Sequence, residues 1–503
     1  MSPAAKPARA SRAALIGNSG TIDPARLHRA LNPKTVAVVG DKGPNYNWIT
    51  NLKEFTGKVY SVQLDEKEIP GILERGVPNF RSLMEIPEEI DLVICAVPRQ
   101  VTPFIMKDAV AKQVGGISMF TSGFAETGEE IGVKLQQMVY DTCAESGMPL
   151  VGPNCMGIYN RRLGVKFTGT QEQGEGGEVG IVSQSGTHGI AMTIGSQRLG
   201  VKVTRAISIG NAVVLNEADY LQYMLDDPDV RVIAMYLEGV RSGRKFFEVL
   251  KRATRQKPVI LWRGGRTRAG ARAVRSHTGS LASDDAIWSA LVKQAGAISV
   301  DTLEDVVDTI AALVHAPATP KRNLALVAMT GGQSVAITDQ FERAGFEVPE
   351  LSKKSYDILS EFFVTIGGSY KNPFDASSTI GRETDNLAKI FEVLANDKAI
   401  DGGVAFELGS RGFGDDSGRF DEVLGLLRAY RDRTGLPVVC LMPDGGVMGG
   451  DAEVLVRARS HVAQAGFPVY PSFQRGALAL GRAASYWAWR KEVGARPRAT
   501  AKA

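Results

Sequence analysis

The sequence predicts an α/β protein made of three consecutive doubly wound domains, each with a parallel sheet between two layers of helices. Short apolar runs that end in glycine or a polar turn alternate with stretches of helix length along most of the chain. This alternation restarts after a Gly/Glu-rich turn at 171–178 and again after a proline-containing linker at 317–322. The length of 503 residues also exceeds one ordinary core, since domains have about 100–200 residues.

The first domain is predicted over residues 23–165. The run "KTVAVVG" is typical of a buried strand that feeds a turn, and "VTPFIMKDAVAKQVG" and "EIGVKLQQMVYDTCAESG" have the length and pattern of helices. Such alternation favours a Rossmann-like sheet. The later strands of this domain are expected at "KVYSVQ", "IDLVICAVP", "GGISMFTSG" and "MPLVGPN".

The second and third domains are predicted over 175–316 and 323–490, both flavodoxin-like. The second ends in the helix "TLEDVVDTIAALVHA", and the third ends in a terminal helix. The strands of the second are expected at "VGIVSQSG", "VKVTRAISIG", "VRVIAMYLEG" and "KPVILWRGG". Those of the third are expected at "NLALVAMTGG", "DGGVAFELGS", "LPVVCLMPDGG" and "FPVYPSF".

The excess positive charge lies at the two ends of the chain. Residues 1–22 carry three basic and no acidic side chains, a net of +3, and residues 490–503 carry five basic side chains and one acidic, a net of +4. Subtracting both from the total, 4 − 3 − 4, leaves the rest of the chain at −3. A nucleic-acid-binding face is therefore not predicted. The N-terminal composition fits either an organelle transit peptide or a disordered tail, and we expect the disordered tail.

The four cysteines, Cys95, Cys143, Cys155 and Cys440, show neither paired nor metal-type spacing. Disulfides and a metal site are therefore not predicted, and a reducing, cytoplasmic location is expected. No apolar run approaches the ~20 residues that span a bilayer, so no membrane association is predicted.

Polar residues at the strand ends indicate where a ligand binds, because ligands of open parallel sheets lie beyond the carboxyl ends of the strands. In "GIVSQSGTHG", Ser183, Ser185 and Gly186 stand between a strand and a helix, where hydroxyls and N–H groups suit a phosphate. The alternative is an ordinary Ser/Gly turn that caps a helix.

Glu238 and His277 form a second candidate pair. Glu238 ends the apolar run "VRVIAMYLEG", where a carboxylate needs solvent or a cationic or N–H partner. A carboxylate bonded to one imidazole nitrogen of His277 would leave the other nitrogen as a nucleophile, which suits a phosphohistidine, with Arg275 adding positive charge. We expect His277 in a loop ahead of a helix over 283–295 capped by Ser283. The alternative is a solvent-exposed histidine without chemistry.

Several motifs in succession resemble those of the nucleoside-diphosphate-forming acyl-CoA synthetases, the superfamily that includes ADP-forming acetyl-CoA synthetase and succinyl-CoA synthetase. They run in family order across nearly the whole chain. The motifs are "GFAETGEE", "VGPNCMGIYN", "GIVSQSG", "SIGN", "YLEGVRSGRKF", "SHTGSLASDD", "KQAG", "TGGQSVAITDQFERAGFEV" and "NPFDASS".

The resemblance implies a CoA-binding first domain, a ligase domain that carries the phosphohistidine, and a flavodoxin-like companion domain. His277 matches the phosphorylated histidine, Glu238 the acid that holds it, and Ser183, Ser185 and Gly186 the phosphate-binding turn. The residues that the resemblance assigns to CoA and acyl binding are Gly40, Pro98, Gly123, Phe124, Asn154 and Cys155.

The implied activity is that of an α-type subunit of an acid–CoA ligase. ATP phosphorylates the histidine, the phosphoryl group passes to a carboxylic acid, and CoA attacks the acyl phosphate. No stretch of the chain remains for an ATP-grasp domain, so the resemblance implies a separate ATP-grasp β-type subunit that supplies ATP and Mg²⁺ in a hetero-oligomer. The alternatives are a non-ligase CoA- or acyl-CoA-binding or regulatory protein and other acyl-CoA chemistry on the same scaffold.

The chain departs from the family pattern after its first strand. The turn "GDKGPNYNWITN" carries Asp41, Tyr46 and Trp48 where small residues are usual, and we expect a narrowed or reshaped groove for the CoA nucleotide. The segment "VQLDEKEIPG" stands where relatives commonly have an Asn-Pro-Lys type segment, so the resemblance does not supply a basic side chain there for the CoA phosphate. The sequence leaves open which carboxylic acid is used and whether the nucleotide is ATP or GTP. Residues that could line the acyl pocket are Phe124, Met156, Tyr159 and His188, although a helix-surface position is also open for His188.

Overall fold

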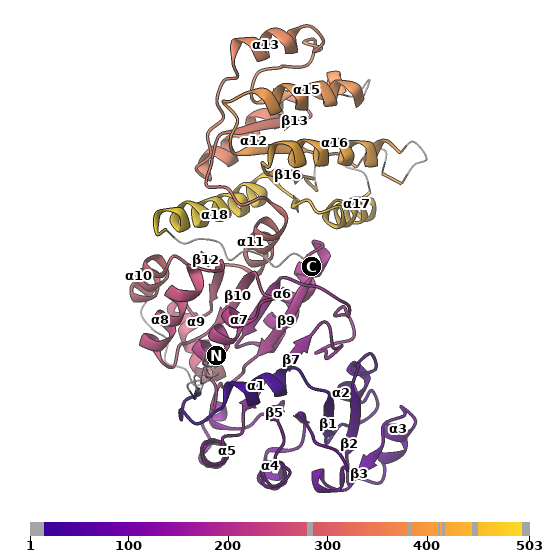
Figure 1. Ribbon diagram of the computed structural model, residues 1–503, viewed down its shortest axis with the longest axis vertical. Coiled ribbons are helices and arrows are strands. Elements are labelled where there is room, and N and C mark those ends of the chain that lie inside the picture. Colours follow the sequence, from indigo (N-terminus) through magenta and orange to yellow (C-terminus); the bar gives the residue numbers. More distant parts are fainter. Residues whose placement is uncertain are drawn as a thin grey trace, which may run out of the picture.

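A computed structural model describes residues 15–278, 285–380, 384–410, 413–414, 418–444 and 451–494. Three sheets of largely parallel strands follow one another along the long axis of the molecule, and each belongs to one successive part of the chain (Figure 1). The predicted fold class is therefore confirmed.

The first unit has a six-stranded parallel sheet in the order β3-β2-β1-β4-β5-β6. Its strands are β1 (Thr35–Val39), β2 (Lys58–Val62), β3 (Asn79–Phe80), β4 (Leu92–Cys95), β5 (Gly116–Met119) and β6 (Leu150–Val151). Its helices are α1 (Pro24–Leu31), α2 (Asn47–Asn51), α3 (Ile69–Leu73), η1 (Leu83–Glu85), η2 (Arg99–Val101), α4 (Thr102–Ala111), η3 (Ala125–Thr127) and α5 (Glu130–Ser146).

The second unit has the strand order β12-β11-β10-β8-β9-β7. Its strands are β7 (Gly157–Asn160), β8 (Val179–Ser183), β9 (Val203–Ser208), β10 (Val232–Leu237), β11 (Val259–Arg263) and β12 (Ile298–Val300). Its helices are α6 (Gly186–Arg198), α7 (Glu217–Asp226), α8 (Gly243–Thr254), α9 (Arg268–Thr278), α10 (Asp285–Ala295) and α11 (Leu303–His315).

Strand β7 differs from the prediction. It lies within the range 23–165 expected for the first domain, yet it pairs antiparallel with β9 at the edge of the second sheet. All its residues are buried. The second unit therefore takes its edge strand from the segment that leaves the first sheet.

The third unit has the strand order β14-β13-β15-β16-β17. Its strands are β13 (Leu324–Ala328), β14 (Phe374–Asp375), β15 (Gly403–Glu407), β16 (Val438–Leu441) and β17 (Val469–Tyr470). Its helices are α12 (Gly331–Arg343), α13 (Lys353–Ser360), α14 (Ser377–Ile380), α15 (Thr384–Asn396), α16 (Arg419–Thr434), α17 (Ala452–Gln464) and α18 (Phe473–Glu492).

Both faces of the central strands are buried, which explains why they are continuous apolar runs. In β10, Ile233 and Met235 face a core shared with α7 and α8, while Val232 and Ala234 face the core that contains side chains of α6 and α11. The first of these cores continues into the first unit, and the second continues into the third unit. The three sheets are thus joined through shared apolar cores.

Residues 15–22 do not form the disordered tail that the sequence predicted for 1–22. Ile16 and Ile22 are bridged, and the Asn18 side chain donates to the carbonyl of Val213 at 2.6 Å. The backbone N–H of Gly17 donates to Asp219 at the start of α7, 3.3 Å away. At the other end, the basic tail was predicted over 491–503, but α18 continues through Glu492. Residues 1–14 and 495–503 lie outside the described residues.

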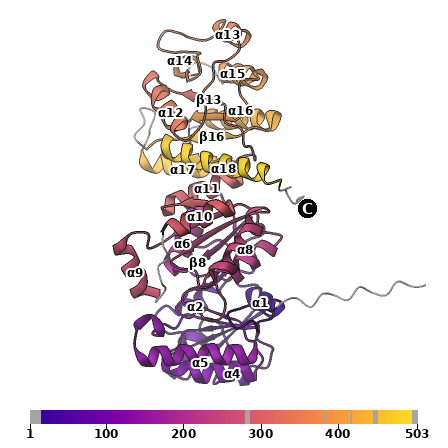
Figure 2. The same cartoon turned by 90° about the vertical axis from the view of Figure 1, so that its left-hand side faces the viewer.

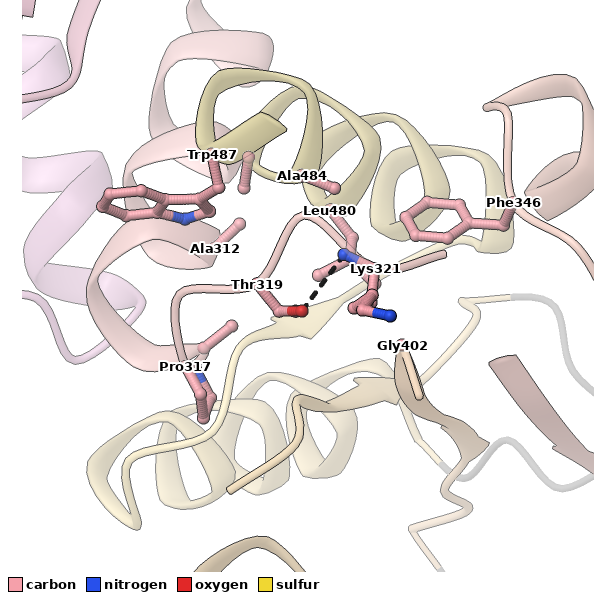
Figure 3. Close-up of a pocket in the computed structure, with 11 residues that line it drawn as sticks. Ala312, Pro317, Thr319, Lys321, Phe346, Gly402, Leu480, Ala484 and Trp487 are labelled. Carbon is pink, nitrogen blue, oxygen red and sulfur yellow. Dashed lines mark hydrogen bonds between the residues drawn. The ribbon is translucent and has the colours of Figure 1, made fainter. Parts of the chain in front are cut away.

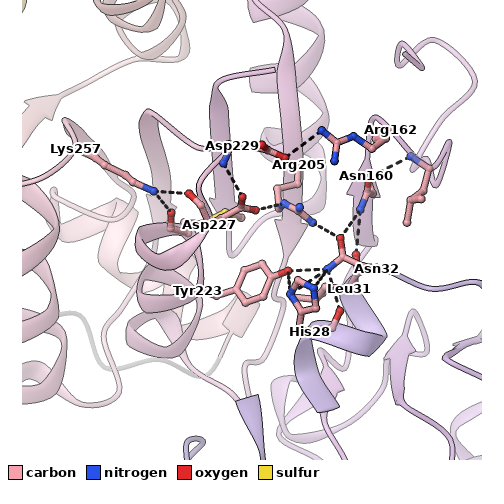
Figure 4. Close-up of polar contacts among 12 residues, drawn as sticks. His28, Leu31, Asn32, Asn160, Arg162, Arg205, Tyr223, Asp227, Asp229 and Lys257 are labelled. Carbon is pink, nitrogen blue, oxygen red and sulfur yellow. Dashed lines mark hydrogen bonds and ion pairs between the residues drawn. The ribbon is translucent and has the colours of Figure 1, made fainter. Parts of the chain in front are cut away.

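Polar contacts join the first unit to the second at helix α1 (Figure 4). The Asn32 Oδ1 accepts from the Arg205 guanidinium at 3.0 Å and from Asn160 at 3.3 Å. The Tyr223 hydroxyl oxygen of the second unit lies 3.3 Å from Nδ1 of His28 on α1. These bonds fix the angle at which the first sheet meets the second.

The second and third units meet through α11 and α18, which lie side by side (Figure 2). Asp308 on α11 is 2% exposed and accepts two hydrogen bonds from the Arg475 guanidinium, at 2.6 and 2.8 Å. Beside this contact, the space between the linker and α18 is nearly filled, with a cavity of about 10 Å³ lined by Thr319, Phe346 and Trp487 among others (Figure 3).

Among the described helices, none combines the length and the hydropathy that a membrane crossing requires.

Candidate functional site

The turn between β8 and α6 holds the predicted phosphate-binding residues. Ser185 is the N-cap of α6, and its hydroxyl accepts from the His188 N–H at 3.3 Å. Gly186 and Thr187 follow in the first turn, where N–H groups have no intrahelical acceptor. Free N–H groups and the positive end of a 13-residue helix make this turn suitable for an anion.

Ser183 plays a different part from the one predicted. It is fully buried, and its hydroxyl donates to the Ser185 carbonyl at 2.6 Å and accepts from the Ser185 N–H at 3.2 Å. Both bonds stay within the turn. Ser183 therefore shapes the anion-binding turn and is not among the residues that line the adjacent pocket.

A pocket of about 220 Å³ lies where this turn meets the first unit. It brings together five residues that the sequence singled out: Asn154, Cys155, Met156, Ser185 and Gly186. The other residues that line it are Phe120, Ser122, Gln184, Thr187, Ile190 and Gly210. The pocket thus joins the carboxyl edge of the first sheet to the start of α6.

Asn154 is held in the left-handed region, with φ 59°, and its side chain donates to Asn211 at 3.3 Å. Asn211 in turn donates to Glu126 at 2.7 Å, so one chain of hydrogen bonds links the two units beside Asn154. This chain positions the Asn154 amide at the pocket. Asn211 and Glu126 lie within the quoted motifs "SIGN" and "GFAETGEE", but sequence reasoning gave neither residue a role.

Cys155 is 5% exposed, and its thiol lies 3.5 Å from the carbonyl oxygens of Met119 and Val151. Burial raises the pKa of the thiol to about 12. The protonated thiol is a weak nucleophile, so Cys155 contributes shape to the pocket and not a reactive thiolate.

The predicted CoA residues Gly40, Pro98 and Gly123 lie near one another at the carboxyl edge of the first sheet. Gly40 follows β1 with φ +84°, and a Cβ there would lie 2.5 Å from Val97. A Cβ on Gly123 would lie 2.9 Å from Arg99, whose guanidinium donates to the Gly123 carbonyl at 2.6 Å. Pro98 is exposed. None of the three lines the pocket.

Phe124 and Tyr159, predicted near the acyl group, do not line the pocket. Phe124 is fully buried in the core, and Tyr159 is 1% exposed with its hydroxyl donating to the Glu172 carbonyl at 2.7 Å. The aromatic side chain that does line the pocket is Phe120, directly after β5, which is 44% exposed. An aromatic residue one position beyond an apolar strand was the signal that could have identified it.

Glu238 lies at the end of β10 and is 5% exposed. The Gln184 side chain accepts from the N–H groups of Glu238 and Gly239 and donates to the Gly239 carbonyl at 3.0 Å, so the end of β10 is tied to the anion-binding turn. Burial and the Glu238 carboxylate raise the pKa of the neighbouring Tyr236 hydroxyl.

His188 is neither in the pocket nor on a bare helix surface. Its ring lies 4.4 Å from the Tyr236 ring and 4.5 Å from the Trp262 ring, between centroids. The three rings form an aromatic cluster beside Glu238, above the carboxyl ends of β10 and β11.

His277 lies in the last turn of α9, so the predicted loop at this residue is wrong. The Ala- and Arg-rich segment before it has a high helix propensity, which extends the helix through His277. Helix α9 lies against η3 of the first unit, beside the motif that contains Gly123 and Phe124. The side chains of His277 and Arg275, and the predicted cap Ser283, lie outside the described part of the structure.

Two family models match the chain. Residues 34–161 match the CoA binding domain, and residues 176–313 match the succinyl-CoA ligase like flavodoxin domain. These matches define a class of protein in which a CoA-binding unit precedes a ligase-type flavodoxin unit.

Curated relatives narrow this class. The α subunit of ADP-forming acetate–CoA ligase II from Pyrococcus furiosus is 32% identical over 432 residues, which cover 84% of this chain and 92% of that protein. The α subunit of ligase I from the same organism is 34% identical over 69% of this chain and 76% of that protein. The chain belongs to the nucleoside-diphosphate-forming acyl-CoA synthetase family, which confirms the resemblance seen in its motifs.

Other relatives are longer. ADP-forming acetate–CoA ligase I of Archaeoglobus fulgidus is 33% identical over 379 residues, 75% of this chain, but the match covers only 54% of that protein. The chain thus spans about half the length of this relative. Among solved structures, acetyl-coenzyme A synthetase 1 of Ca. Korarchaeum cryptofilum, in complex with phosphate and ADP, superposes with a TM-score of 0.78 at 26% identity, over 93% of this chain and 98% of that one.

Proposed function

We propose that the chain is the α-type subunit of an acid–CoA ligase that converts a carboxylic acid, CoA and ATP into an acyl-CoA, ADP and phosphate. One observation carries this proposal. The pocket joins the strand-end segment 154–156 of the CoA-binding unit to the anion-binding turn of α6 in the ligase unit. A phosphoryl group on that turn and a thiol arriving from the first unit would meet the same acid.

The proposed chemistry has three steps. His277 accepts a phosphoryl group from ATP, the carboxylate oxygen of the acid attacks that phosphorus, and the CoA sulfur then attacks the acyl carbon and displaces phosphate. The N–H groups of Gly186 and Thr187 would stabilise the transferring phosphoryl group, because such transfer depends mainly on positioning and charge. Glu238, tied to the same turn through Gln184, would orient the His277 ring.

We infer that the nucleotide is bound by a separate ATP-grasp β-type subunit, which would hold ATP and Mg²⁺. The match covers 92% of the P. furiosus ligase II protein, which is named as an α subunit, but only 54% of the longer A. fulgidus ligase I. This difference in length supports a second subunit for the part of the longer protein that the match does not cover. The four free, buried cysteines fit a cytoplasmic enzyme.

The test is incorporation of phosphate from labelled ATP into the full chain, mixed with a purified ATP-grasp subunit. Acid-labile label is expected on the wild type and on the control variant His461→Gln, which changes a histidine of α17 in the third unit whose side chain is 41% exposed and paired with Asp421. Loss of the label in His277→Ala supports the proposal. Label at the wild-type level in that variant refutes His277 as the carrier, and CoA binding without any label in the wild type would favour the non-ligase alternative.

A further inference from the structure

The loop between β9 and α7, residues 209–216, lies against the pocket. Gly210 lines the pocket, and a Cβ on this glycine would lie only 2.2 Å from the carbonyl oxygen of Pro153. The N–H of Asn211 donates to the same carbonyl at 3.0 Å. One side of the loop is therefore packed directly on the segment that carries Asn154.

Carbonyl groups of the same loop accept hydrogen bonds from Asn18. The Asn18 side-chain amide donates to the carbonyls of Ala212 and Val213, at 3.2 and 2.6 Å. The Asn18 N–H donates to the Val214 carbonyl at 2.8 Å, and the Asn18 Oδ1 accepts from the Asn216 side chain at 2.7 Å. Asn18 thus bonds to a loop that lies far along the chain, since 194 positions separate it from Ala212.

Asn18 is directed at the loop by a folded turn. Ile22 is fully buried in the core that the first and second units share, and it exchanges two backbone hydrogen bonds with Ile16, at 2.8 and 3.0 Å. The Gly17 N–H donates to Asp219 at 3.3 Å. Contacts on both sides of Asn18 therefore fix the direction of its side-chain amide.

The loop needs these bonds because it is buried and held in an unfavourable conformation. Ala212 and Val214 are each 1% exposed, and a buried carbonyl requires a hydrogen-bond partner. Ala212 also has φ 49°, a left-handed conformation that an alanine keeps only when its surroundings impose it. Asn18 therefore maintains the backbone of the loop, although Asn18 is itself exposed.

The conformation of the loop determines where Asn211 lies. Asn211 is 4% exposed, and its side chain donates to Glu126 at 2.7 Å and accepts from the Asn154 amide at 3.3 Å. A shift of the backbone at 212–214 would move Asn211 and, with it, the Asn154 amide at the pocket. A misplacement of about 1 Å in a reacting site can cost about 10²-fold in rate.

We propose that Asn18 is a positioning residue for the CoA reaction. Its amide holds the loop 209–216, and through Asn211 it holds the Asn154 amide where the CoA-binding unit meets the anion-binding turn. The inference rests on the proposed function and adds a residue that lies in none of the quoted motifs. It implies that the binding and reaction of CoA depend on Asn18, whereas phosphorylation of His277 by ATP does not.

Two measurements on the full chain test the inference without the partner subunit. In Asn18→Ala, hydrogen–deuterium exchange of the Asn211 and Val213 amides, which donate to the carbonyls of Pro153 and Gly152, is expected to rise by about tenfold. Calorimetry with CoA is expected to give a Kd about three- to tenfold higher, because the loop must then be ordered on binding.

Asn18→Asp separates hydrogen bonding from shape. The aspartate has the same shape, but its carboxylate cannot donate to the carbonyls of Ala212 and Val213, so its effects should equal or exceed those of Asn18→Ala. The matched control is Asn396→Ala, which removes an exposed asparagine of α15 that donates to the Glu392 carbonyl at 2.8 Å. This control is expected to leave both measurements unchanged. The melting temperature reports separately whether each variant folds.

Loop exchange at the wild-type rate in Asn18→Ala, or an unchanged Kd for CoA despite faster exchange, would overturn the inference. Wild-type behaviour of Asn18→Asp would also overturn it, because the two donors are then not needed. The proposed function fails by a different measurement, the phosphate label on His277. Asn18→Ala is expected to carry that label at the wild-type level.

Discussion

Arg205 of the second unit lies in a buried ion pair with Asp227, Nε to Oδ2 2.5 Å, and the same guanidinium donates to Asn32 of the first unit at 3.0 Å. The side chains of Arg205 and Asp227 are 11% and 6% exposed. The Arg205 guanidinium thus balances the buried Asp227 carboxylate and also links the second unit to Asn32 of the first unit.

Arg205→Met is expected to destabilise the protein by about 3–5 kcal/mol, because it leaves the Asp227 carboxylate buried without its cation. Chemical denaturation monitored by circular dichroism, together with scanning calorimetry, measures the change in the free energy of unfolding. The control is Arg231→Met, which breaks a surface pair with Glu178 and is expected to cost less than about 1 kcal/mol. Equal effects of the two variants would contradict the assigned role of the buried pair.

Cys155 is expected to resist alkylation by iodoacetamide at pH 8 in the folded protein. Its thiol is 5% exposed and its pKa is raised to about 12 by burial, so the thiolate is scarce at that pH. Peptide mass spectrometry after a timed reaction measures modification, and the same chain unfolded in guanidinium provides the reactive reference. Rapid labelling of native Cys155 would show that the pocket opens further than the structure indicates.

Glu217→Gln is expected to change how stability depends on pH. Glu217 is fully buried at the start of α7, and burial raises the pKa of its carboxyl. A raised folded pKa stabilises the wild type below the unfolded value of about 4.3, and this contribution is lost as pH rises through the folded pKa. The free energy of unfolding of the variant minus that of the wild type should therefore increase with pH over this window and then level off.

Urea unfolding at a series of pH values from 4 to 8 measures this difference. Glu248→Gln, on α8 with a side chain that is 61% exposed, is the matched control for the loss of one carboxylate. A flat line for Glu217→Gln would contradict the raised pKa of Glu217.

Ser185→Ala is expected to act on both stability and phosphoryl transfer. It removes the N-cap acceptor of α6, which costs about 1 kcal/mol, and it removes a hydroxyl at the anion-binding turn. Loss of one positioned donor reduces such a transfer by about 10²–10³-fold. Labelling kinetics with the partner subunit measure the rate, and Ser185→Thr should retain most of it because the hydroxyl is kept.

The sheets could be predicted because strands buried on both faces are continuous apolar runs, as β10 is and as β8 is up to Ser183. The pairing of β7 with β9 could not be predicted, because the sequence of a four-residue strand does not indicate which sheet it joins. That choice depends on how the first and second units pack against each other.

The site was predicted at the level of motifs, while the orientation of single side chains was not. Phe120 and Phe124 both follow β5, but Phe120 lines the pocket and Phe124 is buried in the core. The difference comes from the backbone between them. Glu126 accepts from the N–H groups of Gly123 and Phe124, at 2.6 and 3.1 Å, and Gly123 has φ +95°, which turns the chain so that Phe124 points into the core. Such a local reversal has no periodic signature.

Helix α18 closes the chain by lying on α11, which belongs to the preceding unit, and their side chains share one apolar core. An expression fragment that stops after residue 316 would therefore carry a bare hydrophobic stripe on α11 and expose the Asp308 carboxylate. Dissection of this protein into separate modules is expected to yield an insoluble middle piece. A protein in which a further segment is fused after this chain must therefore keep the 20-residue helix α18 packed on α11.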